Sequence, residues 1–142
     1  MSAVKGVNKT LIDAGTILSP GLFDGRVKVN VDSYEASSLT AGSTITMSGV
    51  IPKGAVVLFQ LLATDSLGGS STISVGDAED ADRYHATLDT SSAAITVIGL
   101  VDGVAYEVDE SDSDNLDNQI ILTTAGATIN GTIKLLTFYT ND

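Results

Sequence analysis

The stretch Val27-Lys28-Val29-Asn30-Val31-Asp32 alternates apolar with polar residues. Because successive side chains of a strand point to opposite faces, this period of two predicts a β-strand with one wet face. The stretch Ser43-Thr44-Ile45-Thr46-Met47-Ser48 alternates in the same way. Helical period and length are missing along the whole chain, apart from one short turn expected near Ala78–Tyr84. The chain is therefore expected to be all-β.

Further strand candidates follow along the chain, and turn sequences such as Pro52-Lys53-Gly54 and Asn130-Gly131 separate them. About eight strands, with turn signals about every 8–12 residues, predict an antiparallel two-layer β-sandwich that is jelly-roll-like. The strand candidates are Val27–Val31, Ser43–Ser48, Ala55–Ala63, Thr72–Val75, Ala94–Val101, Val104–Val108, Gln119–Thr124 and Thr132–Thr140. The expected core positions include Val56, Leu58, Ile73, Val97, Ile121 and Leu135.

Two of the strand candidates are apolar on both faces, namely Ala55–Ala63 and Ile133–Tyr139. A strand of an isolated two-layer sandwich should have one apolar and one polar face. Cover for the outer face is therefore expected, either from the N-terminal segment or from a neighbouring subunit. A bulge that shifts the alternation within the strand is the alternative explanation.

The N-terminal segment Met1–Gly25 has no sustained period and is rich in turn residues. It is expected to be an extended arm or a set of turns, so the chain divides into an arm at residues 1–25 and a β-sandwich domain at residues 26–142. The N-terminal end is slightly basic, whereas most of the 18 acidic residues lie between Asp77 and Asp117. Such an asymmetry is typical of a protein that docks on a partner through one end.

Composition excludes several classes of function. The net charge of -11 argues against nucleic-acid binding, which needs clustered Lys and Arg. Cysteine is absent, which excludes disulfides and zinc–thiolate sites. The sequence shows neither a secretory signal nor an apolar run that could cross a bilayer. The expected protein is a soluble domain without a nucleic-acid or membrane partner.

No catalytic constellation can be named. His85 is the only histidine, and neither a Gly-x-Ser-x-Gly elbow nor a glycine-rich phosphate loop accompanies it. The acidic clusters Asp77–Asp82 and Glu107–Asp117 fail the EF-hand spacing, because Leu88 and Leu116 stand at ligand positions. We therefore expect no enzyme activity, no cofactor and no metal site. Solvated acidic loops are preferred, and a calcium cage outside the EF-hand motif stays open.

A family resemblance is carried by segments spread over most of the chain. The most specific is Leu67–Tyr84, and the others are Gly6–Thr10, Ala41–Ile45, Pro52–Val57, Gly131–Leu135 and Tyr139-Thr140. In these segments the chain resembles small all-β head structural proteins, the capsid decoration proteins, of tailed bacteriophages. The resemblance implies synthesis in the host cytoplasm and attachment to the outer capsid surface. It also implies a homotrimer, the major capsid protein as partner, and no catalytic residues.

On that resemblance, the expected capsid contacts are the basic residues of the N-terminal end. They are Lys5, Lys9, Arg26 and Lys28. A decoration protein that binds only the assembled shell stabilises it by linkage. The alternative function is a fibre or tail-associated binding module that recognises a host surface ligand, although the absence of Trp weighs against sugar. Binding to emptied, expanded capsids or to host cells distinguishes the two.

Overall fold

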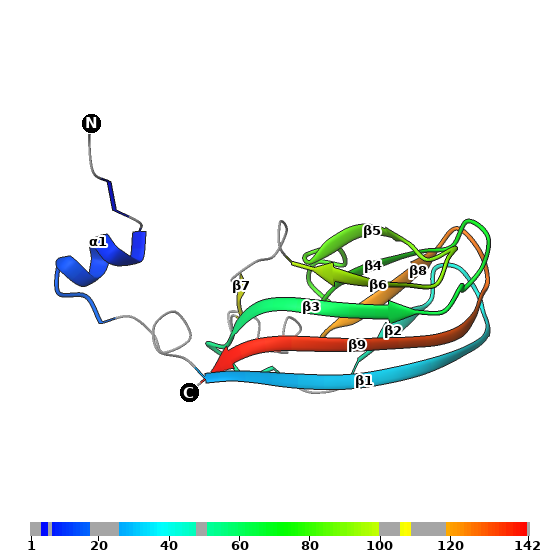
Figure 1. The fold of residues 1–142 in the computed structure, drawn as a ribbon, viewed down its shortest axis with the longest axis horizontal. Coiled ribbons are helices and arrows are strands. Elements are labelled where there is room, and N and C mark those ends of the chain that lie inside the picture. Colours follow the sequence, from blue (N-terminus) through cyan, green and yellow to red (C-terminus); the bar gives the residue numbers. More distant parts are fainter. Residues whose placement is uncertain are drawn as a thin grey trace.

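A computed structural model describes residues 4–5, 7–17, 26–47, 51–99, 106–108 and 119–141. These residues form one helix and two antiparallel sheets that pack as a two-layer sandwich (Figure 1). The elements are α1 (Val7–Asp13), β1 (Arg26–Leu39), β2 (Thr44–Thr46), β3 (Val56–Thr64), β4 (Thr72–Gly76), β5 (His85–Asp89), β6 (Ala94–Ile98), β7 (Tyr106–Glu107), β8 (Ile121–Ala125) and β9 (Ile129–Asn141).

The strand order is that of a jelly roll. The five-stranded sheet has the order β1-β9-β3-β6, with β7 also pairing with β3, and the four-stranded sheet has the order β2-β8-β4-β5. With β7 set aside, each sheet contains four of the eight remaining strands, and their order is that of a double Greek key. The predicted antiparallel sandwich is confirmed.

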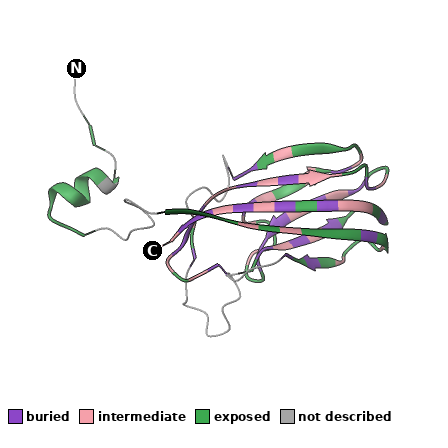
Figure 2. Cartoon of the chain, turned by 60° about the horizontal axis from the view of Figure 1, so that its bottom comes forward, coloured by how far each residue is buried: buried purple, intermediate pink, exposed green. Residues whose placement is uncertain are grey.

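The core lies between the two sheets and consists mainly of branched aliphatic side chains. Figure 2 marks the buried residues, which alternate with more exposed ones along the strands. Leu62 of β3 lies opposite Leu135 of β9, and both are buried. The second sheet contributes Ile73 and Leu122, which have no exposed surface. Of the expected core positions, Val56, Ile73 and Leu135 are confirmed as buried.

The other three expected core positions are wrong, because their side chains lie on outer faces or beside an irregularity. Val97 is 47% exposed, since it is the register partner of Leu61 on the outer face of the first sheet. Ile121 is half-buried, and its neighbour Leu122 takes the core position instead. Leu58 is half-buried at a register shift in β3.

Several element boundaries also differ from the sequence prediction. Strand β5 was missed, and β1 continues to Leu39 rather than ending near Val31. The segment expected as a short helical turn near Ala78–Tyr84 consists of turns and bends. The ends of three predicted strands, at residue 48 and at residues 100–101 and 104–105, lie outside the described residues.

The N-terminal segment contains a helix, which corrects the expectation of an extended arm or a set of turns. α1 ends in a Schellman motif: the N–H of Gly15 donates to the carbonyl of Ile12, and the N–H of Thr16 donates to the carbonyl of Leu11. Gly15 has a φ of 84°, which suits glycine at this position. Within the described residues, no helix combines the length and apolar character needed to cross a membrane.

Candidate binding surface

The face of the five-stranded sheet that points away from the core is apolar. Register partners on neighbouring strands share a face, and here Val29 of β1 lies opposite Phe138 of β9, which lies opposite Phe59 of β3. In the next row Leu136 and Leu61 are partners in the same way. We call the resulting surface the outer apolar face. Its residues are Val27, Val29, Val31, Phe59, Leu61, Ile95, Val97, Leu136 and Phe138.

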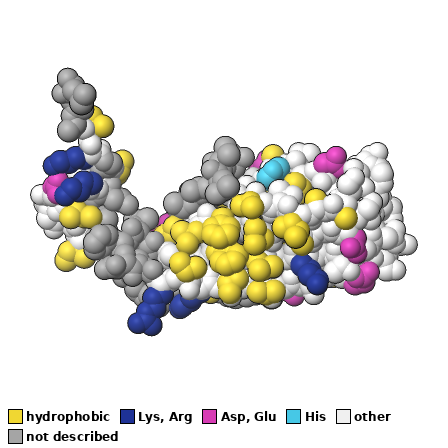
Figure 3. Space-filling model, viewed as in Figure 1, with side chains coloured by type: hydrophobic (Ala, Val, Ile, Leu, Met, Phe, Trp, Pro, Cys, Tyr) yellow, Lys and Arg dark blue, Asp and Glu magenta, His cyan; other side chains and the backbone are white. Residues whose placement is uncertain are grey.

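The outer apolar face is open to solvent over much of its area. Ile95 is 76% exposed and Val31 is 60% exposed. The central aromatic residues Phe59 and Phe138 are half-buried because they stack on each other, with 4.5 Å between ring centroids. Figure 3 shows hydrophobic side chains gathered over this sheet. A contiguous exposed apolar surface of this kind is typical of an interaction site.

The direction of β1 makes this surface larger than the sequence predicted. The alternation of Val27–Asp32 does form a strand, but the exposed valines lie on the face that points away from the core. Lys28 lies opposite Tyr139, whose side chain belongs to the core, so Lys28, Asn30 and Asp32 project on the core side of the sheet. The register of β1 against β9 determines which face of β1 points away from the core. The alternation in the sequence separates two sets of residues but does not say which set faces the core.

The doubly apolar segment of β3 has two causes. The register against β9 shifts between Val57 and Phe59, so the bulge alternative is present, and Val56 and Val57 are consecutively buried. Beyond the bulge the strand alternates normally, with Gln60 and Leu62 buried and Leu61 on the outer face. The bulge therefore explains part of the pattern, and the outer face remains apolar.

Charged residues lie at one end of this face. Lys134 is the register partner of Ser33, and Thr132 donates its hydroxyl hydrogen bond to the Glu35 carboxylate at 2.5 Å. An open hollow of about 470 Å³ lies here, and its lining includes Ala63 and Lys134. The nine residues of the outer apolar face include no ionisable side chain.

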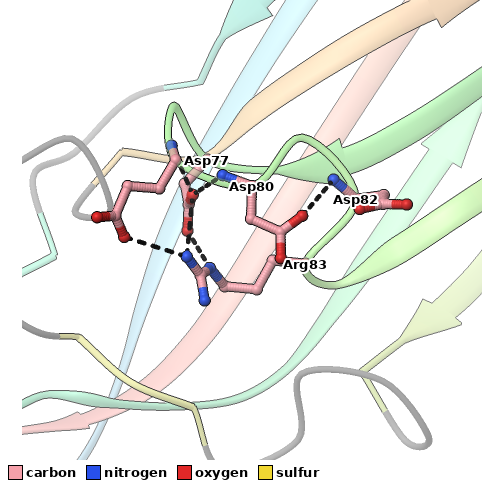
Figure 4. Close-up of polar contacts among 5 residues, drawn as sticks. Asp77, Asp80, Asp82 and Arg83 are labelled. Atoms are coloured by element: carbon pink, nitrogen blue, oxygen red, sulfur yellow. Dashed lines mark hydrogen bonds and ion pairs between the residues drawn. The ribbon is translucent and has the colours of Figure 1, made fainter.

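The acidic stretch after β4 is folded around one buried carboxylate, that of Asp77 (Figure 4). Its Oδ1 accepts the backbone N–H groups of Glu79 at 3.0 Å and Asp80 at 2.8 Å. Its Oδ2 forms an ion pair with Arg83, whose guanidinium lies 4.2 Å from the ring centroid of Tyr106. The cluster thus connects the β4–β5 loop to β7, and its carboxylate is used within the protein.

This arrangement keeps Arg83 charged. Partial burial lowers the pKa of Arg83, but the hydrogen bond and charge of Asp77 raise it by more, so the pKa lies above its ordinary value. Across the part of the chain that the structure describes, no group of three or more His, Asp or Glu side chains is arranged to hold a metal ion. Residues 109–117 of the second acidic cluster lie outside the described residues.

The predicted capsid contacts fall into two pairs. Lys5 and Lys9 both form ion pairs with Asp13, the second at 2.5 Å, and these contacts lower the pKa of Asp13. Arg26 and Lys28 are exposed on one face at the start of β1. Residues 18–25, which connect the pairs, lie outside the described residues.

Sequence reasoning assigned no binding role to the valine row of β1 or to Ile95 of β6, and it placed Val97 of β6 in the core. The doubly apolar strands β3 and β9 were the signal that could have located the surface, because their register partners necessarily share the exposed face. His85, the single histidine, is half-buried, and its Nδ1 accepts the N–H of Thr87 at 3.2 Å.

Comparison with known proteins identifies the fold. No protein-family model and no curated protein matches the chain. A chain in the capsid asymmetric unit of cyanophage Pam1 matches with a TM-score of 0.74 and 22% identity, over 100% of both chains. A chain of the capsid of Ralstonia phage GP4 matches with a TM-score of 0.61 and 19% identity, over 83% of this chain and 86% of that one. Both structures are phage capsids, in agreement with the sequence resemblance. The chain therefore shares its jelly-roll fold with chains of two phage capsids.

Proposed function

We propose that this chain is a structural protein of a phage virion that decorates the outer surface of the assembled head. The observation that carries the proposal is the full-length likeness to a chain of the Pam1 capsid, at a TM-score of 0.74. The sequence resemblance to decoration proteins supports the same conclusion independently. A fold alone does not define a role, so the proposal also depends on the surfaces described above.

The partner on the head is the major capsid protein, and the arm at residues 1–25 is the attachment element. Every described side chain from Val4 to Ile17 is exposed, including the apolar side chains of Val7 and Leu11. A helix as short as α1 is marginal in water unless its apolar side packs on something. Docking on the shell supplies such a surface, and Arg26 and Lys28 extend the basic end onto the sandwich.

The free protein is a homotrimer in this proposal. A cyclic trimer brings the same face of three copies to one axis, and the outer apolar face gives each copy a surface that needs cover. Trimers also match threefold positions of an icosahedral shell, where one trimer contacts several capsid subunits at once.

The role is structural, without catalysis or a cofactor. Decoration stabilises the shell because the protein binds the assembled form and not its free subunits, so binding free energy adds to the stability of the assembly. The acidic body at residues 26–142, which carries the whole net charge of -11, keeps decorated particles apart by mutual repulsion.

The test is binding of the purified full chain to emptied, expanded heads of its phage, measured by co-sedimentation, together with the heat resistance of the heads. We expect saturable binding and a higher temperature of capsid disruption. Deletion of residues 2–25 should abolish binding while circular dichroism still reports a β-sandwich. Lys5→Gln combined with Lys9→Gln should weaken binding, whereas Lys53→Gln, a lysine outside the arm, should not.

Binding to host cells without binding to heads would favour the alternative, a fibre or tail-associated module that recognises a host surface ligand. Unchanged binding of the deletion variant would instead move the attachment to the loops around Pro52 or Gly68.

A further inference from the structure

We propose that the outer apolar face is the surface through which copies of this chain contact one another. The inference deepens the proposed function and rests on it in one respect: a decoration protein must stay soluble before it meets the head. An uncovered apolar sheet face would then be exposed for the whole free lifetime of the protein, which promotes aggregation. Contact between copies covers it from the start.

The size of the face is that of a substantial part of an interface. Four strands at a spacing of about 4.8 Å, over the roughly 23 Å between the row of Val27 and the row of Ile95, give a footprint on the order of 440 Å². Stable interfaces bury about 800 Å² per partner, so this face supplies about half of what is required.

Charge at the outer apolar face does not oppose a second copy. Each copy carries a net charge of -11, so two copies repel each other over most of their surfaces. The nine residues of the outer apolar face include no Asp or Glu, so contact through them avoids this repulsion, and Glu35 lies beyond them at the end of the face. Lys134 is the nearest base along β9, and it lies at the end of the face.

The shape of the face is also that of a sheet-packing surface. Valines on β1 and the aliphatic residues Ile95 and Val97 on β6 form ridges on either side of the stacked pair Phe59 and Phe138. Sheets pack face to face through such side chains at a distance of about 10 Å. Interfaces draw most of their binding energy from a few residues near their centre, and the stacked pair Phe59 and Phe138 has that position here.

The experiment places a charge on the face of the full-length protein. Val29→Glu combined with Val97→Glu changes two exposed side chains, so folding should be retained, and the circular dichroism spectrum checks this. The matched control is Thr87→Glu, an exposed position on β5 of the other sheet. Light scattering of the wild type should give a multiple of the 14.6 kDa monomer mass. The double variant should give the monomer mass, and the control should keep the wild-type mass.

Cysteine cross-linking adds an independent measurement, because the natural chain has no cysteine. Val31→Cys should form disulfide-linked dimers rapidly under mild oxidation, whereas Thr87→Cys should not.

Three results would overturn the inference. The first is a monomeric wild type. The second is an unchanged mass of the glutamate variant, and loss of head binding in that variant would then assign the face to the capsid. The third is a monomer produced by deletion of residues 2–25, since the arm would then be the cover. A wild-type oligomer that the glutamates dissociate but that never binds heads supports the inference and refutes the proposed function.

Discussion

The ring of Phe59 in β3 stacks on the ring of Phe138 in β9, with 4.5 Å between centroids and 12° between the ring planes. The two residues are register partners directly after the bulge that separates Val57 from Phe59. The bulge thus brings an aromatic residue to the outer face at a position where its partner is also aromatic. The pair lies between the exposed valines of β1 and the exposed residues of β6.

We expect this pair to stabilise the sheet beyond the area that each ring buries. A double-mutant cycle with Phe59→Ala and Phe138→Ala should give a coupling of about 0.5–1.5 kcal/mol in the free energy of unfolding. Urea denaturation at a fixed protein concentration measures it. Additive effects, within about 0.3 kcal/mol, would contradict a specific ring–ring contribution.

Removal of Arg83 should be costly, because it leaves the buried carboxylate of Asp77 without its cation. We expect Arg83→Met to lower the free energy of unfolding by about 2–4 kcal/mol, since breaking a buried ion pair from one side costs about 3–5 kcal/mol and two backbone N–H groups still bind the carboxylate. The control Arg26→Met, at an exposed position, should change it by less than about 0.5 kcal/mol. Equal changes in the free energy of unfolding for Arg83→Met and Arg26→Met would show that the Asp77–Arg83 ion pair does not stabilise the fold.

Gly126 and Gly54 form a matched pair of glycines. Both have positive φ values, 81° and 74°, but a Cβ at Gly126 would collide with the backbone of Ser70, whereas one at Gly54 meets nothing within 4 Å. We expect Gly54→Ala to cost about 1–2 kcal/mol from backbone strain alone. Gly126→Ala should cost at least about 3 kcal/mol, because the steric clash adds to the strain. Thermal unfolding followed by circular dichroism compares them.

Gln60 is fully buried on the core side of β3, and its amide has no hydrogen-bond partner among the described residues. A buried polar group without a partner costs about 1–3 kcal/mol. Gln60→Met has a similar volume and should therefore raise the free energy of unfolding by about that amount. Gln119→Met, at an exposed position, should have no effect. A loss of stability in Gln60→Met would reveal an internal water that binds the amide.

Asp13 should titrate below its ordinary pKa of 3.8, because hydrogen bonds from Lys5 and Lys9 lower its pKa. Because the pKa of Asp13 is lower when α1 is formed, the ionised carboxylate stabilises α1 at pH values above the pKa of the unfolded chain. This contribution is lost as the pH falls through the pKa of the folded state. NMR titration should show a midpoint below 3.8 and a decrease of helical chemical shifts over the same range. In Lys5→Gln combined with Lys9→Gln, the midpoint should return toward 3.8.

Much of the fold could be predicted because alternation and turn residues are local signals. The strands around Ile45, Leu62, Ile73 and Leu135 are predicted by their apolar residues and by their β-branched composition. Strand β5, with the sequence His-Ala-Thr-Leu-Asp, was missed because it lies on a sheet edge and buries little. The helix α1 was missed because its seven residues are shorter than the windows in which helical periodicity is visible.

The candidate surface was only half predictable. A doubly apolar strand indicates that its outer face needs cover, and the sequence of β3 shows this directly. The direction of the valines in β1 follows from the register of Lys28 against Tyr139, which is a long-range pairing that no local pattern contains. The same reason explains why Val97 was placed in the core.

The pairing of β1 with β9 joins Arg26 to Asn141, so the start of the sandwich and the C-terminal end of the last strand lie at the same end of the molecule (Figure 1). The β3–β4 connection lies at the opposite end, where Gly69 is exposed and has open space around it. A reporter fused to the C-terminus would stand beside the arm and compete with it for room. A peptide inserted after Gly69 would instead be displayed away from the arm. The fold therefore offers a scaffold that presents foreign sequences from a turn and leaves the strands intact.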